Sequence, residues 1–486
     1  MSEDGLKSQT VSSLIWKLLE RGGNQIIQLA VQIVLARILI PEDFGALAIM
    51  LVFVNIGNAI VQSGLNTAIV QAPEIDEGDF STVFWMSFVI SIILYFGIFI
   101  FAPAVATFYS MPAIVWPLRV LCLILPFGAF NSVQIAIVQR RLQFRKIFIA
   151  TMFAVVSSAI FGIGLAAAGS GIWALVVQQL VYQAVSCVVM AFQVRWRPRF
   201  VFVASRASRL FSFGWKLLAS GLLEQVYESL SDLIIGKQFS ATSLGLVSQG
   251  KKYPAALGSM LDGAIQPVML SAVSRVQADV YYVKRLVRRA LKTSTFLIVP
   301  SMTLFAVAAK PIVGILLGEK WLPCVPFLQV YCFIYALLPI HTTNLQALNG
   351  MGRSDLFLKL ELIKKAYGIC FILFAAFIFK DIYLMVSMYM ITGIISTFVN
   401  AYPNKRVIGY SYSEQIRDIA PAFVISAIAG GLALFCGSFV ASPELQILVE
   451  VAFMAITYFG IAGIFKLEAF EYLINTARDF LGAKRR

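Results

Sequence analysis

Residues 81–107 read STVFWMSFVISIILYFGIFIFAPAVAT, a stretch without a single charged side chain. A helix that crosses the hydrocarbon core of a bilayer needs about 20 predominantly apolar residues. This segment exceeds that length, so it predicts a membrane-spanning helix. Similar apolar runs recur along the 486-residue chain and decide the fold class, which is an all-α polytopic membrane protein.

The overall composition supports this class. Apolar residues make up 59% of the chain and charged residues 13%, whereas soluble proteins carry roughly 25% charged residues. The six cysteines form no CxxC pair, and His341 is the single histidine, so we expect no disulfide framework, metal, cofactor or enzyme activity. The net charge of +14 is interpreted as membrane topology and contact with anionic lipid, and not as nucleic-acid binding.

Fourteen stretches are long and apolar enough to be membrane helices, and turn residues such as Pro41-Glu42-Asp43 separate them. Their expected boundaries are 14–39, 44–70, 81–107, 115–139, 147–168, 172–194, 211–236, 244–272, 291–309, 324–350, 355–379, 382–402, 418–440 and 444–465.

The distribution of Lys and Arg predicts the orientation, because cytoplasmic connections carry an excess of both. With both termini placed inside, 31 of the 39 basic residues fall on the inner side, six on the outer side and two within a helix. The connection 71–80 departs from the pattern, since it is acidic without a base. We expect both ends in the cytoplasm.

The first and second halves resemble each other, which predicts a duplicated six-helix unit. Residues 16–19 (WKLL) recur at 215–218, and Gly45 matches Gly245. Six is an even number, so both lobes should run the same way across the membrane. The expected domains are a cytoplasmic N-terminus (1–13), an N-lobe (14–194), a basic linker (195–210), a C-lobe (211–402), two extra helices with the preceding loop (403–465) and an amphipathic basic cytoplasmic tail (466–486). Residues 276–292 and the tail are predicted as helices lying in the interface.

Polar side chains fall on single faces of several predicted spans, where lipid contact would be costly. They indicate either a wet cavity with sugar contacts or hydrogen bonds between helices; for His341 we favour a hydrogen-bonded interior residue over a ligand. The candidates for cavity contacts are Asn24, Gln28, Asn55, Asn58, Gln62, His341 and Asn344.

Acidic residues follow one face of the seventh predicted span. Glu224, Glu228 and Asp232 are four residues apart, and Asp262 lies in the next span. Three carboxylates in a row repel one another unless a cation or proton relieves them. The row is therefore either a Na⁺ or H⁺ coupling site or gate, or a structural ion-pair cluster.

Basic residues inside or at the ends of the spans suggest an anionic substrate, because Lys and Arg bind phosphate oxygens strongly. Some of them could instead extend to the inner headgroups. The candidates for pyrophosphate binding are Arg21, Lys17, Lys216, Lys251 and Lys252.

Several motifs resemble the polysaccharide transporter family, the Wzx-like flippases of the multidrug/oligosaccharidyl-lipid/polysaccharide superfamily. They are LIPEDFG at 39–45, GLNTAIVQ at 64–71, Leu244-Gly245, and PVMLS at 267–271. The resemblance implies alternating access by a flippase in the bacterial inner membrane. It also implies a substrate of undecaprenyl-pyrophosphate-linked oligosaccharide (O-antigen, capsule or exopolysaccharide) and partners such as a polysaccharide polymerase and a chain-length regulator.

Three alternatives stay open at this point. A lipid II-type flippase would share fourteen helices. A MATE-like drug or cation antiporter would have twelve helices and an acidic cavity. A non-transporting membrane subunit of a polysaccharide assembly complex belongs to a different functional class.

Overall fold

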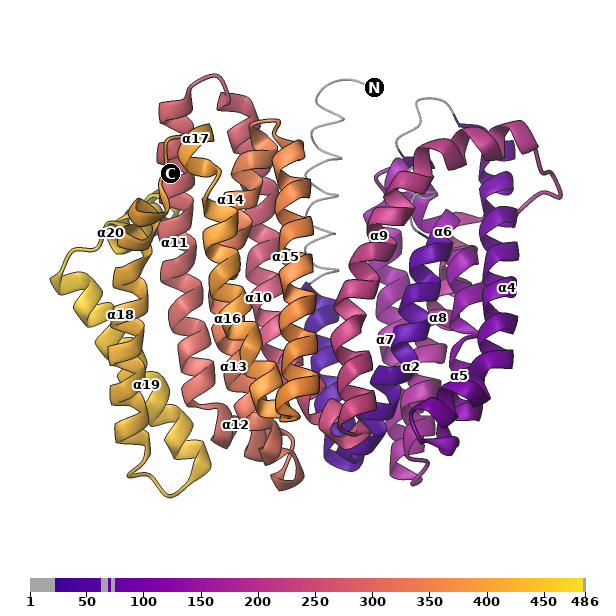
Figure 1. Cartoon of the computed structure of the whole chain (residues 1–486), viewed down its shortest axis with the longest axis horizontal. Helices are drawn as coiled ribbons and strands as arrows, with labels where there is room; N and C mark the ends of the chain where they lie inside the picture. Colours follow the sequence, from indigo (N-terminus) through magenta and orange to yellow (C-terminus); the bar gives the residue numbers. More distant parts are fainter. Residues whose placement is uncertain (1–21, 63–68, 71–74, 484–486) are drawn as a thin grey trace. The chain divides into compact units, whose positions relative to one another are not determined.

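The computed structural model describes residues 22–62, 69–70 and 75–483. The side chains at positions 206, 209, 210, 213, 216, 217, 261, 264, 476, 477 and 479–483 are not described. Within these ranges every regular element is a helix (Figure 1), as the sequence predicts.

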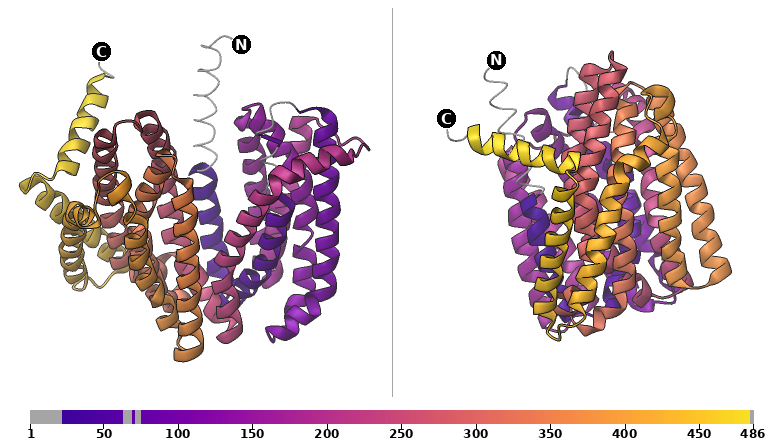
Figure 2. Two further views of the ribbon diagram at one scale, coloured as in Figure 1. Left: turned by 45° about the horizontal axis from the view of Figure 1, so that its top comes forward. Right: turned by 90° about the vertical axis from the view of Figure 1, so that its left-hand side faces the viewer.

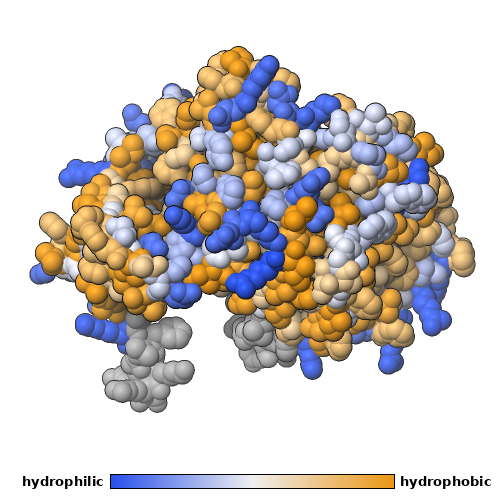
Figure 3. Space-filling view, turned by 90° about the horizontal axis from the view of Figure 1, so that it is seen from below, coloured by the Kyte–Doolittle hydropathy of each residue, from blue (hydrophilic) through white to orange (hydrophobic). Residues whose placement is uncertain are grey.

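Twelve helical segments in the described part are long and apolar enough to cross a membrane. Many large hydrophobic side chains are exposed, as expected for a protein surrounded by lipid. Figure 3 shows hydrophobic and hydrophilic residues side by side on the face seen from below. The segments are Pro41–Gln62, Glu77–Phe108, Pro112–Arg140, Phe144–Ala167, Ile172–Val194, Ala241–Val276, Val280–Val307, Glu319–Gly350, Ser354–Phe379, Ile382–Val407, Tyr412–Gly437 and Pro443–Ile464.

The expectation of fourteen spans is thus confirmed for twelve. The predicted span 14–39 lies partly outside the described residues, although 22–38 are helical. The predicted span 211–236 forms part of a long helix, α9 (Ala204–Gln238), which is not among the twelve. The same acidic row that makes α9 a candidate site lowers its hydropathy.

The chain divides into two compact units, residues 1–245 and 246–486. This division differs from the lobe boundary at 195–210 that the repeat suggests, because α9 packs against α2 and α4 of the first unit. The first unit contains α2 (Pro41–Gln62), α4 (Glu77–Phe108), α5 (Val115–Leu121), α6 (Ile124–Arg140), α7 (Phe144–Ala167), α8 (Ile172–Val194) and α9.

The acidic connection before α4 has a structural explanation. Asp76 accepts a hydrogen bond from the backbone N–H of Asp79 (2.9 Å), and Asp79 accepts one from that of Asp76 (3.1 Å). This reciprocal capping box satisfies backbone donors that the first helical turn leaves unpaired. Glu77 accepts a hydrogen bond from the indole of Trp196 (3.0 Å). Asp76, Glu77 and Asp79 of this acidic connection therefore begin and anchor α4.

The second unit is also helical, and α10 (Ala241–Val276) begins just before it. Its core includes side chains of α11, α14 and α18. The other helices are α11 (Val280–Val307), α12 (Ala309–Leu316), α13 (Val325–Ala336), α14 (Leu338–Gly350), α15 (Ser354–Phe374), α16 (Ile382–Ala401), α17 (Asn404–Val407), α18 (Tyr412–Gly437), α19 (Pro443–Ile464) and α20 (Glu468–Ala483).

Helix α11 corrects one expectation. The sequence suggested a separate interfacial helix over 276–292, but α11 runs without a break from Val280 to Val307. Val283, Val287 and Leu291 are fully buried at four-residue spacing, so the apolar face continues into the later span and no residue ends the helix between them. The other predicted interfacial segment does form a separate helix, α20, which runs across the direction of α18 and α19 (Figure 2).

Candidate functional site

The helix over residues 22–38 carries polar side chains of two kinds, some buried against other helices and some exposed. The Asn24 amide donates a hydrogen bond to the Thr151 hydroxyl (2.7 Å), and the Gln32 amide donates one to Gln178 (3.3 Å). Both side chains are buried, so they connect helices of the first unit. Gln28 is exposed and keeps its candidacy for substrate contact. Lys17 and Arg21 lie outside the described residues.

Helix α2 carries the next polar face. The Gln62 amide donates a hydrogen bond to Asn58 (3.3 Å), and both side chains lie against Gly128 of α6, where a Cβ would come within 2.9 Å of the Asn58 oxygen. Asn55 is exposed on the same helix. On this face of α2, the Asn55 amide is accessible, whereas Asn58 and Gln62, one and two turns later, contact α6.

Helix α9 holds the acidic row in the first unit. Glu224 and Glu228 are exposed, and Asp232 is half-buried. No group of three His, Cys, Asp or Glu side chains that could hold a metal ion occurs among the described residues. Successive carboxylates of the row are about 6 Å apart along the axis at 1.5 Å per residue. The side chain of Lys216, further back on this helix, is not described.

Helix α10 carries Lys251, Lys252 and Asp262, which all lie in the second unit and are half-buried. Asp262 accepts a hydrogen bond from the hydroxyl of Thr342 on α14. Lys251 and Lys252 occupy a helix interior, as the sequence predicts. Asp262 serves at least in part to connect α10 to α14.

Asn344 belongs to a buried amide network and is only 1% exposed. Its amide donates to Gln415 (2.8 Å), and Asn404 donates to the Asn344 side-chain oxygen (2.7 Å). His341 contacts Asn400 (3.1 Å). These hydrogen bonds connect α14, α16, α17 and α18, which agrees with the interior role favoured for His341. Asn344, expected as a sugar contact, is buried inside this network.

Sequence reasoning missed the partners in this network. Asn400 and Asn404 are four residues apart at the end of an apolar span, and the Asn404 amide donates a hydrogen bond to the Asn400 carbonyl oxygen (3.4 Å) across the break between α16 and α17. That spacing was a usable signal. The pairing with Gln415 was not readable, because it joins segments whose approach depends on the packing of the second unit.

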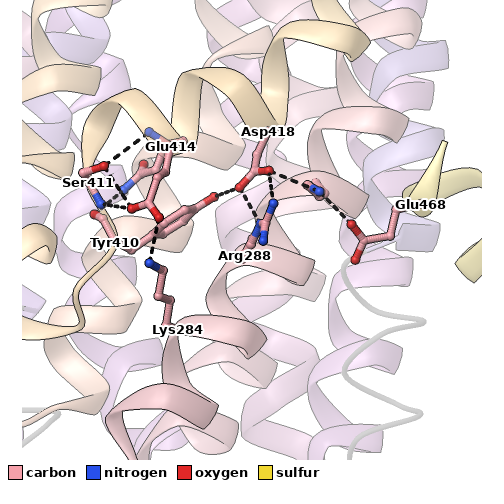
Figure 4. A network of polar contacts seen from close by, with 9 residues as sticks. Lys284, Arg288, Tyr410, Ser411, Glu414, Asp418 and Glu468 are labelled. Atoms are coloured by element: carbon pink, nitrogen blue, oxygen red, sulfur yellow. Dashed lines mark hydrogen bonds and ion pairs between the residues drawn. The ribbon is translucent and has the colours of Figure 1, made fainter.

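An ion-pair cluster joins α11, α18 and α20 (Figure 4). Arg288 binds Asp418 through two hydrogen bonds of 2.7 Å, and Lys292 lies 3.1 Å from Asp418 and 2.7 Å from Glu468. Lys284 pairs with Glu414 (2.8 Å). The three bases are spaced four residues apart on α11, so they form one row. The sequence assigned them to topology, and the structure shows that they also bind carboxylates of two later helices.

Two glycines explain two of the motifs that carry the family resemblance, residues 39–45 and Leu244-Gly245. A Cβ at Gly45 would overlap the carbonyl oxygen of Ala241, and a Cβ at Gly245 would overlap that of Pro41. The two contacts are equivalent, since Pro41 and Gly45 correspond to Ala241 and Gly245 at the repeat offset of 200. The beginnings of α2 and α10 cross so closely that no side chain fits between their backbones. These two motifs therefore have a packing role.

Comparison with known proteins assigns the chain to a protein family. Residues 34–326 match the family described as "Polysaccharide biosynthesis protein", which is more than half of the sequence. The chain belongs to this family. The resemblance to the Wzx-like polysaccharide transporter family is confirmed.

Curated relatives of the family match over most of their length. The succinoglycan biosynthesis transport protein ExoT of Rhizobium meliloti (strain 1021) is 25% identical over 72% of this chain and 71% of its own. The lipopolysaccharide biosynthesis protein WzxC of Escherichia coli (strain K12) is 22% identical over 87% of this chain and 86% of its own. ExoT is named a transport protein, in agreement with the prediction of a transporter.

Solved structures show the same fold. The lipid II flippase MurJ in an inward closed conformation superposes with a TM-score of 0.78, covering 96% of this chain and 100% of its own at 14% identity. An inward-facing multidrug resistance MATE family transporter of the MOP superfamily gives 0.54 over 85% of this chain and 95% of its own, at 16% identity. At these identities the likeness establishes the architecture and leaves the substrate open.

Proposed function

We propose that this protein flips undecaprenyl-pyrophosphate-linked oligosaccharide repeat units from the inner to the outer leaflet of a bacterial cytoplasmic membrane by alternating access. The observation that carries the proposal is membership of the polysaccharide biosynthesis family over residues 34–326. The names of the relatives, which include a succinoglycan transport protein, support export of a glycan.

Polar groups within the helices support a polar, anionic cargo. Gln28 and Asn55 present amides that are exposed in the first unit, and sugars are bound by such donors and acceptors. Lys251 and Lys252 offer ammonium groups within α10 that suit a pyrophosphate. Lys17, Arg21 and Lys216 complete the proposed phosphate-binding set.

The proposal includes fourteen membrane crossings with both termini in the cytoplasm. In a variant without native cysteines, a cysteine at exposed Ser442 should react with an impermeant thiol reagent added outside, and one at exposed Ser354 should not. The repeat-based lobes, 14–194 and 211–402, are the proposed moving parts. Labelling of Ser354 from outside would refute this orientation.

Transport in proteoliposomes tests the function. Wild-type protein should expose a fluorescent polyprenyl-pyrophosphate oligosaccharide to an external quencher, whereas Lys252→Ala should lose most of this activity at equal reconstitution. Lys310→Ala removes the same charge from an exposed position in α12 and serves as the matched control. Equal rates in all three proteins would leave Lys252 without a role in substrate binding.

The second candidate is a lipid II-type flippase, because the structural match to MurJ extends over nearly the whole chain. Translocation of lipid II in the same assay, without translocation of the oligosaccharide carrier, would favour it. Export of a cationic drug would instead favour a MATE-like antiporter. Absence of any translocation by well-folded protein would favour a non-transporting subunit of an assembly complex that contains a polymerase and a chain-length regulator.

The acidic row on α9 is the proposed coupling element. Exposed carboxylates such as Glu224 and Glu228 can take up H⁺ or Na⁺ in one conformation and release it in another. Asp232 extends the row, and Asp262, which accepts a hydrogen bond from Thr342, is the fourth candidate. An imposed pH or Na⁺ gradient would identify the coupling ion.

A further inference from the structure

Helix α11 carries two parallel rows of basic residues with different surroundings. The row of Lys284, Arg288 and Lys292 is neutralised by carboxylates of α18 and α20. Arg285 and Arg289 form the other row, and neither meets a carboxylate among the side chains that the structure describes. Their guanidinium groups lie over aromatic rings instead: Arg285 is 5.0 Å from the Tyr282 ring centroid, and Arg289 is 5.0 Å from that of Tyr472.

A pocket of about 500 Å³ lies beside this second row, between α10, α11 and α20 in the second unit. Its volume falls within the ~300–1,000 Å³ typical of ligand sites. Arg285 and Arg289 contribute its charged groups, and most of the remaining wall is apolar, with Ile265 and Met269 from α10 and Leu297 and Ile298 from α11. The pocket is therefore amphipathic.

The charge lies at one end of the pocket, and the apolar wall continues to the other end. Arg289 and Ile298 are nine residues apart on one continuous helix, which places them about 14 Å apart along the axis. A soluble phosphate would leave the apolar end empty, and a neutral hydrocarbon would leave the arginines without an anion. A lipid with a phosphate headgroup matches both ends. The basic part of α11 also falls on the face predicted to be cytoplasmic, where anionic lipids are enriched.

We propose that this pocket binds an anionic phospholipid, with its phosphate between Arg285 and Arg289 and an acyl chain along Leu297 and Ile298. Tyr472 places α20 at the headgroup end, so the bound lipid would hold this terminal helix against α10 and α11. The proposal concerns a resident lipid and does not depend on the transported substrate.

Native mass spectrometry of the full-length protein with phosphatidylglycerol or phosphatidylcholine tests the proposal. Wild-type protein should bind phosphatidylglycerol at least tenfold more tightly. The double variant R285Q/R289Q should bind both lipids alike, because two charge-assisted contacts are lost. K405Q/R406Q removes the same charge from exposed positions of the second unit and should keep the preference. R285K/R289K, which retains the charges, should keep part of it.

A second variant tests the pocket by filling its space. Ala272 lines the pocket on α10, so Ala272→Phe should fill space and weaken phosphatidylglycerol binding while both arginines remain. Equal affinity of wild-type protein for the two lipids would overturn the proposal. So would undiminished binding by Ala272→Phe, equal losses in R285Q/R289Q and K405Q/R406Q, or displacement of phosphatidylglycerol by an equimolar polyprenyl phosphate, which would assign the pocket to the carrier. None of these outcomes bears on whether the protein translocates its cargo.

Discussion

Asp418 should be the most important carboxylate of the ion-pair cluster for stability. Its side chain is only 4% exposed and accepts two hydrogen bonds from Arg288 (2.7 Å each) and one from the Tyr410 hydroxyl (2.8 Å). Lys292 approaches to 3.1 Å. Asp418→Asn keeps the size of the side chain but removes its charge and directs amide protons toward two cations.

Breaking a buried ion pair costs about 3–5 kcal/mol, because the remaining charge loses its partner. The Arg288 side chain is 50% exposed, so water can partly compensate it. We therefore expect the lower end, about 3 kcal/mol, for Asp418→Asn. Glu414→Gln is the matched control. The Glu414 side chain is 48% exposed and that of its partner Lys284 is 28% exposed. Such exposed ion pairs contribute about 0–1 kcal/mol to the free energy of unfolding. Gln also preserves the capping box with Ser411.

Thermal unfolding in detergent, followed with a thiol-reactive dye, measures the difference. Cys122, Cys187, Cys324 and Cys332 are buried and should react only when the helices separate. Asp418→Asn should lower the apparent melting temperature clearly more than Glu414→Gln. Equal shifts in the two variants would refute the reasoning that burial sets the strength of this cluster.

Three further outcomes are expected. Gly45→Ala should strongly reduce folded yield, because its Cβ would overlap the Ala241 carbonyl, whereas Gly97→Ala, with no atom within 4 Å, should be neutral or stabilising by about 1 kcal/mol; equal yields would contradict the close crossing. Glu228→Gln should bind substrate but lose its response to a pH or Na⁺ gradient in proteoliposomes, whereas the control Glu444→Gln should keep that response. A normal response of Glu228→Gln would make the acidic row structural. The pKa of Glu468 is lowered mainly by its hydrogen bond from a lysine of α11. Its contact therefore stabilises the docked α20 above roughly pH 4.3 and is lost as the pH falls through the lowered pKa. Limited proteolysis should show acid release of α20 in wild-type protein and little pH dependence in Glu468→Gln; identical acid profiles would exclude this contact as the cause.

The membrane class and most of the spans could be predicted from the amino-acid sequence alone. A run such as 81–107 can be satisfied only by a helix in lipid, because a backbone without water must pair its own polar groups. Length and hydropathy are local properties, so they survive any tertiary arrangement. The motif around Gly45 could also be recognised in the sequence and indicated the family. The close backbone contact that requires this glycine could not be predicted from it. The span at α9 was found as a helix, but its acidic row keeps it below the hydropathy of the others.

The roles of individual polar residues were decided only by tertiary structure. Helical spacing placed Asn24, Gln28 and Asn344 on inner faces, but it could not distinguish a side chain that bonds a neighbouring helix from one that remains accessible. Asn24 meets Thr151, 127 positions away, and Asn344 meets Gln415, 71 positions away, whereas Gln28 stays exposed. In a membrane, both outcomes satisfy the rule that a polar group avoids lipid. Which one occurs depends on the helix that packs opposite, and that pairing is a non-local property of the folded chain.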